Sequence, residues 1–82
     1  MTEAAMAAGH EHAFHSFFEA HHAELARLAY LVTGEAVVAD DLAADALLEV
    51  WRYWDRVVAA DNPVGYARGV LVNLARNRIR RL

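Results

Sequence analysis

Hydrophobic residues recur at helical spacing along most of this chain. Between residues 14 and 32 they return every three or four positions, together with one histidine: Phe14, Phe17, Phe18, His21, Leu25, Leu28 and Val32. A second pattern, from about Ala36 to Arg56, has a wide apolar stripe: Leu42, Ala46, Val50, Tyr53, Trp54 and Val57. A third pattern begins at Pro63 and runs to the end of the sequence. These patterns predict three helices with a shared core: Leu28, Leu42, Val50, Trp54, Val70 and Leu74.

Glycine, asparagine and proline mark the expected helix boundaries. Gly34 stands just past the first helix, where a left-handed backbone is favoured, and Asn62 before Pro63 is typical of a helix start. Residues 1–11 are alanine-rich and lack a helical period, so we expect a mobile tail there. The sequence therefore predicts one all-α domain over residues 12–82, a compact three-helix bundle that gains a fourth helix if a short extra turn forms.

Composition narrows the class of protein. With 82 residues, 57% of them hydrophobic, the chain can form one small core, and the absence of cysteine excludes disulfides and thiolate chemistry. The first residues lack the features of a secretory signal, and no apolar run approaches the roughly 18 residues of a membrane span, so we expect a cytoplasmic protein. No phosphate-binding glycine loop or nucleophile elbow occurs, which predicts a protein that is not an enzyme and needs no cofactor.

Charge is divided sharply along the sequence. Residues 1–50 hold nine carboxylates against one arginine, a net charge of −8, whereas residues 51–82 hold seven arginines against two carboxylates, a net charge of +5. This division suggests two charged faces for two different partners. Every basic residue is arginine, whose planar guanidinium matches phosphates and base edges, although GC-rich coding alone would give the same bias.

The second predicted helix has a candidate docking face. A step of 100° per residue places Asp41, Asp45, Leu48 and Arg52 on one stripe. A leucine among charged neighbours is typical of a surface kept for a partner, yet single exposed leucines on solvated faces are also common.

The third predicted helix has a candidate nucleic-acid face. No acid occurs between residues 63 and 82, and the polar side holds Gly65, Gly69, Val72, Asn73, Arg76 and Arg80, with Asn77 at its edge. Arginine and asparagine one turn apart can meet phosphates and base edges, although a solvated basic helix end would have the same pattern. The preceding segment, Trp54 to Asp61, could form a platform for separated DNA strands or could belong to the core.

Five histidines occur in and before the first predicted helix: His10, His12, His15, His21 and His22. Metal binding needs three or four converging ligands, and the sequence has neither cysteine nor an HExxH motif, so we predict no metal site. A metal-binding or storage role for this histidine-rich helix is kept as an alternative that calorimetry with zinc would test.

Several segments together resemble the second conserved domain, region 2, of extracytoplasmic-function sigma factors. They are Phe14, Phe17, His21 and Leu25; Arg27 to Leu31; Thr33 and Gly34; Ala39 to Leu42; Trp51 and Trp54 to Val57; Asp61 to Pro63; and Val70 to Arg76. The resemblance covers roughly Phe14 to Leu82. It implies a small helical bundle that docks on the clamp helices of the RNA polymerase β′ subunit. It also implies recognition and melting of the minus-ten promoter element, with an unpaired non-template base held in a pocket.

The resemblance assigns the docking role to the second helix. The family's motif, usually Asp-Leu-Val-Gln-Glu, falls on Asp41 to Asp45, with Ala44 in place of the glutamine and its amide. The implied polymerase-binding residues are Asp41, Ala44, Asp45, Leu48, Trp51 and Arg52.

The resemblance assigns promoter recognition to the third helix, where the family's base-recognising asparagine matches Asn73. The implied DNA-binding residues are Arg56, Val57, Asn62, Arg68, Asn73, Arg76, Asn77 and Arg80. Val58, Ala59 and Gly69 stand where many relatives carry arginine, which lowers the positive charge available for strand separation.

Two functions are consistent with this resemblance. One is a sigma-factor domain whose partners are core RNA polymerase, non-template promoter DNA and, in addition, an anti-sigma protein, without a membrane partner. The other is a degenerate decoy that binds polymerase or an anti-sigma protein without opening promoters, as the missing glutamine and arginines suggest. Because relatives continue into a second domain that binds the minus-thirty-five element, we expect either a fragment of a longer factor or a natural single-domain variant.

Overall fold

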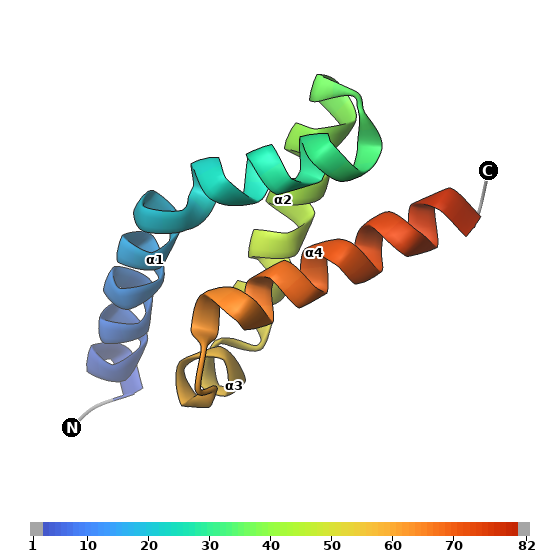
Figure 1. Cartoon of the computed structure of the whole chain (residues 1–82). Helices are drawn as coiled ribbons and strands as arrows, with labels where there is room; N and C mark the ends of the chain where they lie inside the picture. The colour runs from blue at the N-terminus through green and yellow to red at the C-terminus, as the bar shows by residue number, and fades with distance from the viewer. Residues whose placement is uncertain (1–2, 81–82) are drawn as a thin grey trace.

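The computed structural model describes the backbone of residues 3–80 and the side chains of residues 9–80. This part of the chain forms four helices and no strand: α1 (Glu3–Thr33), α2 (Ala36–Arg52), α3 (Trp54–Ala59) and α4 (Pro63–Arg80). The three long helices pack against one another, and the short α3 connects α2 to α4 (Figure 1). The predicted all-α bundle is confirmed, and α3 is the extra helix that we allowed for.

The start of α1 differs from the prediction. The helix begins at Glu3 rather than near residue 12, so residues 3–11 of the expected tail are helical, while residues 1–2 lie outside the described residues. Alanine, which dominates this stretch, has the highest intrinsic helix propensity, and this explains a helix without an apolar period. The predicted mobility of the tail stays a prediction.

The second predicted helix is interrupted. Its backbone leaves the helical region at Tyr53 (φ −111°, ψ 34°), and the chain restarts as α3 at Trp54. No glycine or proline occurs between Glu35 and Asn62, so no local signal marks this break. Trp54 and Val57 are buried, as the apolar stripe predicts, whereas Tyr53, at the break, is 39% exposed.

The core lies where the inner faces of α1, α2 and α4 meet. It contains Leu25, Ala29, Ala39, Leu42, Ala43, Ala46, Leu47, Val50, Trp54, Val57, Ala67, Leu71 and Ala75. Alanine supplies six of these positions, so the helix backbones can approach closely. Of the predicted core residues, Leu42, Val50 and Trp54 are buried as expected. The other three, Leu28, Val70 and Leu74, are partly buried and pack against the core.

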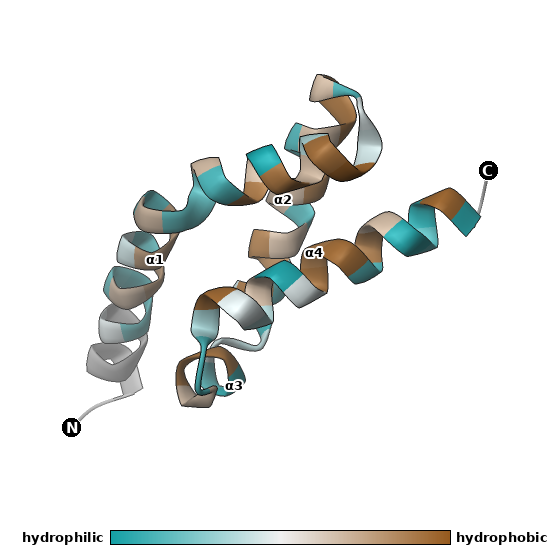
Figure 2. Ribbon diagram, viewed as in Figure 1, coloured by the Kyte–Doolittle hydropathy of each residue, from teal (hydrophilic) through white to brown (hydrophobic). Residues whose placement is uncertain are grey.

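Hydrophobic colour in Figure 2 follows the inner faces of the long helices and also reaches the connection between α1 and α2. Gly34 makes that connection with a φ of +74°, as predicted, and its N–H donates to the carbonyl oxygen of Tyr30 at 2.7 Å.

Within the described part of the chain, none of the helices has a stretch long and apolar enough to cross a membrane.

Candidate functional site

The outer side of α2 brings together all the predicted polymerase-binding residues: Asp41, Ala44, Asp45, Leu48, Trp51 and Arg52 are all exposed. Leu42 and Ala43, in the middle of the motif, are buried, so only its acids and Ala44 face solvent. We call Asp41, Ala44, Asp45 and Leu48 the acidic stripe. Leu48, 55% exposed, gives this stripe an apolar residue at its C-terminal end, as expected for a docking surface.

Two of these residues, Trp51 and Arg52 at the C-terminal end of α2, also make contacts within the protein. The Arg52 guanidinium donates from Nη1 to Glu49 Oε1 at 2.9 Å. The Trp51 ring packs on the Phe14 ring, with centroids 5.1 Å apart, and keeps 38% of its surface exposed. Trp51 therefore serves both the packing of α1 and the exposed surface.

The outer side of α4 carries four of the predicted DNA-binding residues, Asn73, Arg76, Asn77 and Arg80, and all are exposed. We call these residues, together with Gly69, the α4 face. No carboxylate occurs between Pro63 and Arg80, and the space that a Cβ of Gly69 would occupy is open. A polyanion can approach this side of the helix closely and meets only neutral and positive side chains.

Arg68 lies at the flank of the α4 face and is held by α1. Its Nη2 donates to Glu24 Oε1, and Glu24 Oε2 lies 3.6 Å from Nδ1 of His21. The Arg68 guanidinium lowers the pKa of Glu24 below its ordinary value, with a smaller effect from His21, so this carboxylate stays ionised at neutral pH. Arg68 thus makes an ion pair within the protein, although its side chain is exposed.

Asn62 caps α4. Its side-chain Oδ1 accepts a hydrogen bond from the N–H of Gly65 at 3.0 Å, the geometry that its position before Pro63 predicts. A Cβ on Gly65 would lie 2.8 Å from Asn62 Nδ2, so glycine leaves room for the cap. The side-chain oxygen of Asn62 therefore stabilises the start of α4, although the sequence predicts that this residue binds DNA.

The structure corrects one predicted DNA-binding residue and places another. Val57 is completely buried, so its side chain belongs to the core and not to a DNA interface. Its inward direction is the one that its place on the apolar stripe of the sequence predicts. Arg56 is exposed, and its guanidinium carbon lies 5.2 Å from the centroid of the Tyr53 ring, close enough for a cation–π contact.

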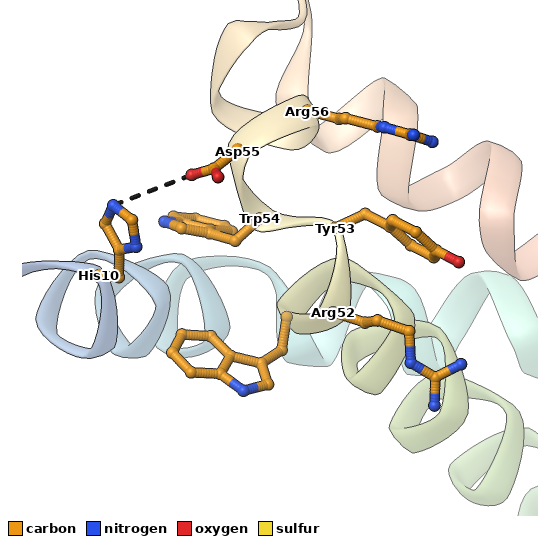
Figure 3. Close-up of a pocket in the computed structure, with 7 residues that line it drawn as sticks. His10, Arg52, Tyr53, Trp54, Asp55 and Arg56 are labelled. Carbon is orange, nitrogen blue, oxygen red and sulfur yellow. Dashed lines mark ion pairs between the residues drawn. The ribbon is translucent and has the colours of Figure 1, made fainter. Parts of the chain in front are cut away.

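A cavity of about 420 Å³ opens at the junction of α2 and α3 (Figure 3). Its lining residues are His10, Trp51, Arg52, Tyr53, Trp54, Asp55 and Arg56. Figure 3 shows His10, on α1, facing Asp55, and the distance from His10 Nε2 to Asp55 Oδ1 is 3.9 Å. The sequence did not predict that His10, Tyr53 and Asp55 line one cavity, because only the early start of α1 and the break in α2 bring them together.

The model of one protein family, described as sigma-70 region 2, matches residues 17–82. The chain belongs to the sigma-70 region 2 family. Domains of this family bind RNA polymerase and take part in promoter recognition, and the family is one of transcription factors rather than enzymes. Comparison with curated proteins and with solved structures gives no match.

The sigma-70 region 2 match includes the acidic stripe, the α4 face, Glu24 and Arg68, but it starts after the first part of α1. His10, His12, His15 and Phe14 precede it. Among the described residues, no three histidine or carboxylate side chains form a group that could hold a metal ion. Phe14, which lies on α1 before the match, packs against Trp51 and Trp54.

Proposed function

We propose that the chain is the region 2 domain of an extracytoplasmic-function sigma factor. In this proposal the acidic stripe docks on the clamp helices of the RNA polymerase β′ subunit. The α4 face and the segment from Trp54 to Asn62 bind the non-template strand of the minus-ten element and hold an unpaired base during melting. The proposal places the protein in the cytoplasm, and it allows an anti-sigma protein as a further partner of the same surfaces.

One observation carries this proposal: the two charged halves of the sequence become two exposed surfaces on different helices. The acidic stripe has exposed carboxylates around Leu48 on α2, and the α4 face is free of carboxylates over its whole length. A protein that must hold both a protein partner and a DNA strand needs such separate surfaces. Opposite charge also steers each partner to its own side.

The α4 face has the chemistry that strand recognition requires. Arg76 and Arg80 supply guanidinium groups for phosphates, a contact that is strong but indifferent to sequence. Asn73 supplies an amide that can donate to and accept from a base edge. Separate residues for affinity and for specificity allow each role to be measured independently.

The docking half of the proposal is tested by charge reversal on the acidic stripe. Asp45→Arg should weaken binding to core polymerase, or to its isolated clamp helices, by about tenfold, because a rim carboxylate is replaced by a cation. Ala44→Gln should strengthen binding by restoring the amide that relatives carry. Both positions are exposed, so thermal unfolding should hardly change.

Asp61→Arg is the matched control for this experiment. It makes the same charge change at an exposed position outside the acidic stripe, so polymerase affinity should stay close to that of the unmodified protein. Equal affinities for Asp45→Arg, Ala44→Gln and the unmodified protein would exclude the acidic stripe as the interface.

A decoy that binds polymerase without opening promoters is a second candidate. Ala44 is exposed in the acidic stripe without the amide of the family motif, and Arg68 is engaged by Glu24. Both features reduce contacts to a partner. The two functions are distinguished by sequence preference, since a decoy should bind promoter and scrambled strands alike.

A further inference from the structure

Arg68 differs from the other arginines of α4. Among the described residues, Arg76, Arg78 and Arg80 have no carboxylate within ion-pair distance, whereas Arg68 is held by Glu24 from α1, forty-four residues earlier in the sequence. His21 Nδ1 lies 3.6 Å from the other oxygen of the same carboxylate, and the His21 ring is tilted against that of Phe17, with centroids 4.7 Å apart. Glu24 is therefore held by the hydrogen bond from Arg68, with His21 as a neighbour, and is not a freely rotating surface acid.

The position of Arg68 makes this contact relevant to DNA. On an ideal helix Arg68 and Arg76 are separated by two turns, about 12 Å along the axis, and by about 80° around it. Arg68 thus extends the positive surface of the α4 face towards α1. The side chain is 45% exposed, so solvent and ligands can reach it.

We propose that Glu24 limits the DNA affinity of this domain by holding Arg68 away from phosphate. The inference depends on the proposed function, because it assumes that the α4 face binds DNA. Glu24 removes one cation from the phosphate-binding set and places an anion beside the strand. Since phosphate contacts are indifferent to sequence, their reduction leaves a larger share of the binding free energy to base recognition.

The test is the salt dependence of single-stranded DNA binding for Glu24→Gln, which keeps the size of the side chain and removes its charge. The logarithm of the affinity should fall more steeply with the logarithm of salt concentration, with a slope larger by about 0.7, the value for one additional phosphate contact on a single strand. The gain in affinity over the unmodified protein should then shrink by about threefold between roughly 50 and 200 mM salt.

A double-mutant cycle distinguishes two effects of Glu24→Gln: the release of Arg68, and the removal of a negative charge near the DNA. Arg68→Gln alone should leave the salt slope unchanged, whereas Arg68→Gln combined with Glu24→Gln should cancel the increase. Glu49→Gln is the matched control, because it also removes the acid of an arginine pair, but on α2 and away from the α4 face. It should leave the slope as it is. If Glu24→Gln lowers the helical content, Glu24→Met carries the same expectation.

Each outcome has a separate meaning. A steeper slope for Glu24→Gln that Arg68→Gln reverses supports the inference. Promoter-selective binding by the unmodified protein with no change in Glu24→Gln overturns the inference and leaves the proposed function standing. A flatter slope in Arg68→Gln alone also overturns it, because Arg68 would then contact phosphate despite Glu24. Absence of DNA binding in every variant would contradict both.

Discussion

The Phe14 ring on α1 meets the Trp54 ring edge-on, with centroids 5.6 Å apart and the ring planes at 89°. Edge-to-face contacts of this kind stabilise a fold beyond the area that they bury. Phe14 precedes the region that matches the family model. The contact therefore packs a part of α1 outside that region against the junction of α2 and α3.

Phe14→Ala should therefore destabilise the fold by about 1 to 3 kcal/mol, because it removes contacts with both tryptophans of the chain. Tryptophan emission should shift to longer wavelength in the folded protein, since Trp54 gains contact with water. Urea unfolding followed by fluorescence measures both effects. His12→Ala, at an exposed position on the same helix, should change neither, and an unchanged emission in Phe14→Ala would show that the N-terminal turns do not pack as described.

Asn62 should matter to stability through its cap. Asn62→Ala should cost about 1 kcal/mol, because the N–H of Gly65 loses its acceptor, whereas Asn62→Ser should keep most of the stability. Comparison of the two variants separates the cap from DNA contact. If Asn62→Ser unfolds normally but binds promoter DNA more weakly, the free end of the amide contacts DNA. Equal stability of Asn62→Ala and the unmodified protein would contradict the capping role.

The contact between Glu24 and Arg68 predicts that the stability of the fold depends on pH. Because Arg68 lowers the pKa of Glu24 in the folded state, the folded protein binds fewer protons than the unfolded chain near pH 4. The stabilisation is fully present above the ordinary value of 4.5 and is lost as the pH falls through the lowered pKa. The stability difference between the unmodified protein and Glu24→Gln should therefore shrink on acidification below that value. A difference that is constant between pH 7 and pH 3 would contradict the contact.

The sequence predicts the long helices and their buried faces because these depend on local periodicity. Gly34 and Asn62 were also predictable, since a left-handed residue after a helix and a capping side chain before proline have local signatures. Exposure of the acidic stripe and the α4 face follows from the same periodicity. The family resemblance then assigned a role to each surface, and membership of the sigma-70 region 2 family is confirmed.

The rest could not be predicted because it depends on contacts between helices. The break at Tyr53 occurs without glycine or proline, at the point where Trp54 is buried against Phe14 and Phe17. The ion pair between Glu24 and Arg68 joins α1 to α4, and no pattern within either helix indicates such a pair.

The central claim is that the α4 face recognises the sequence of a promoter strand, and fluorescence anisotropy with core polymerase present tests it most directly. The unmodified protein should bind a minus-ten non-template strand more tightly than a scrambled strand. Asn73→Ala should remove most of a preference of roughly fivefold to 150-fold, the range that one amide contact to a base edge provides. Arg76→Ala should instead weaken binding to both strands equally and flatten the salt slope. Equal binding of promoter and scrambled strands by the unmodified protein would contradict the claim and favour the decoy.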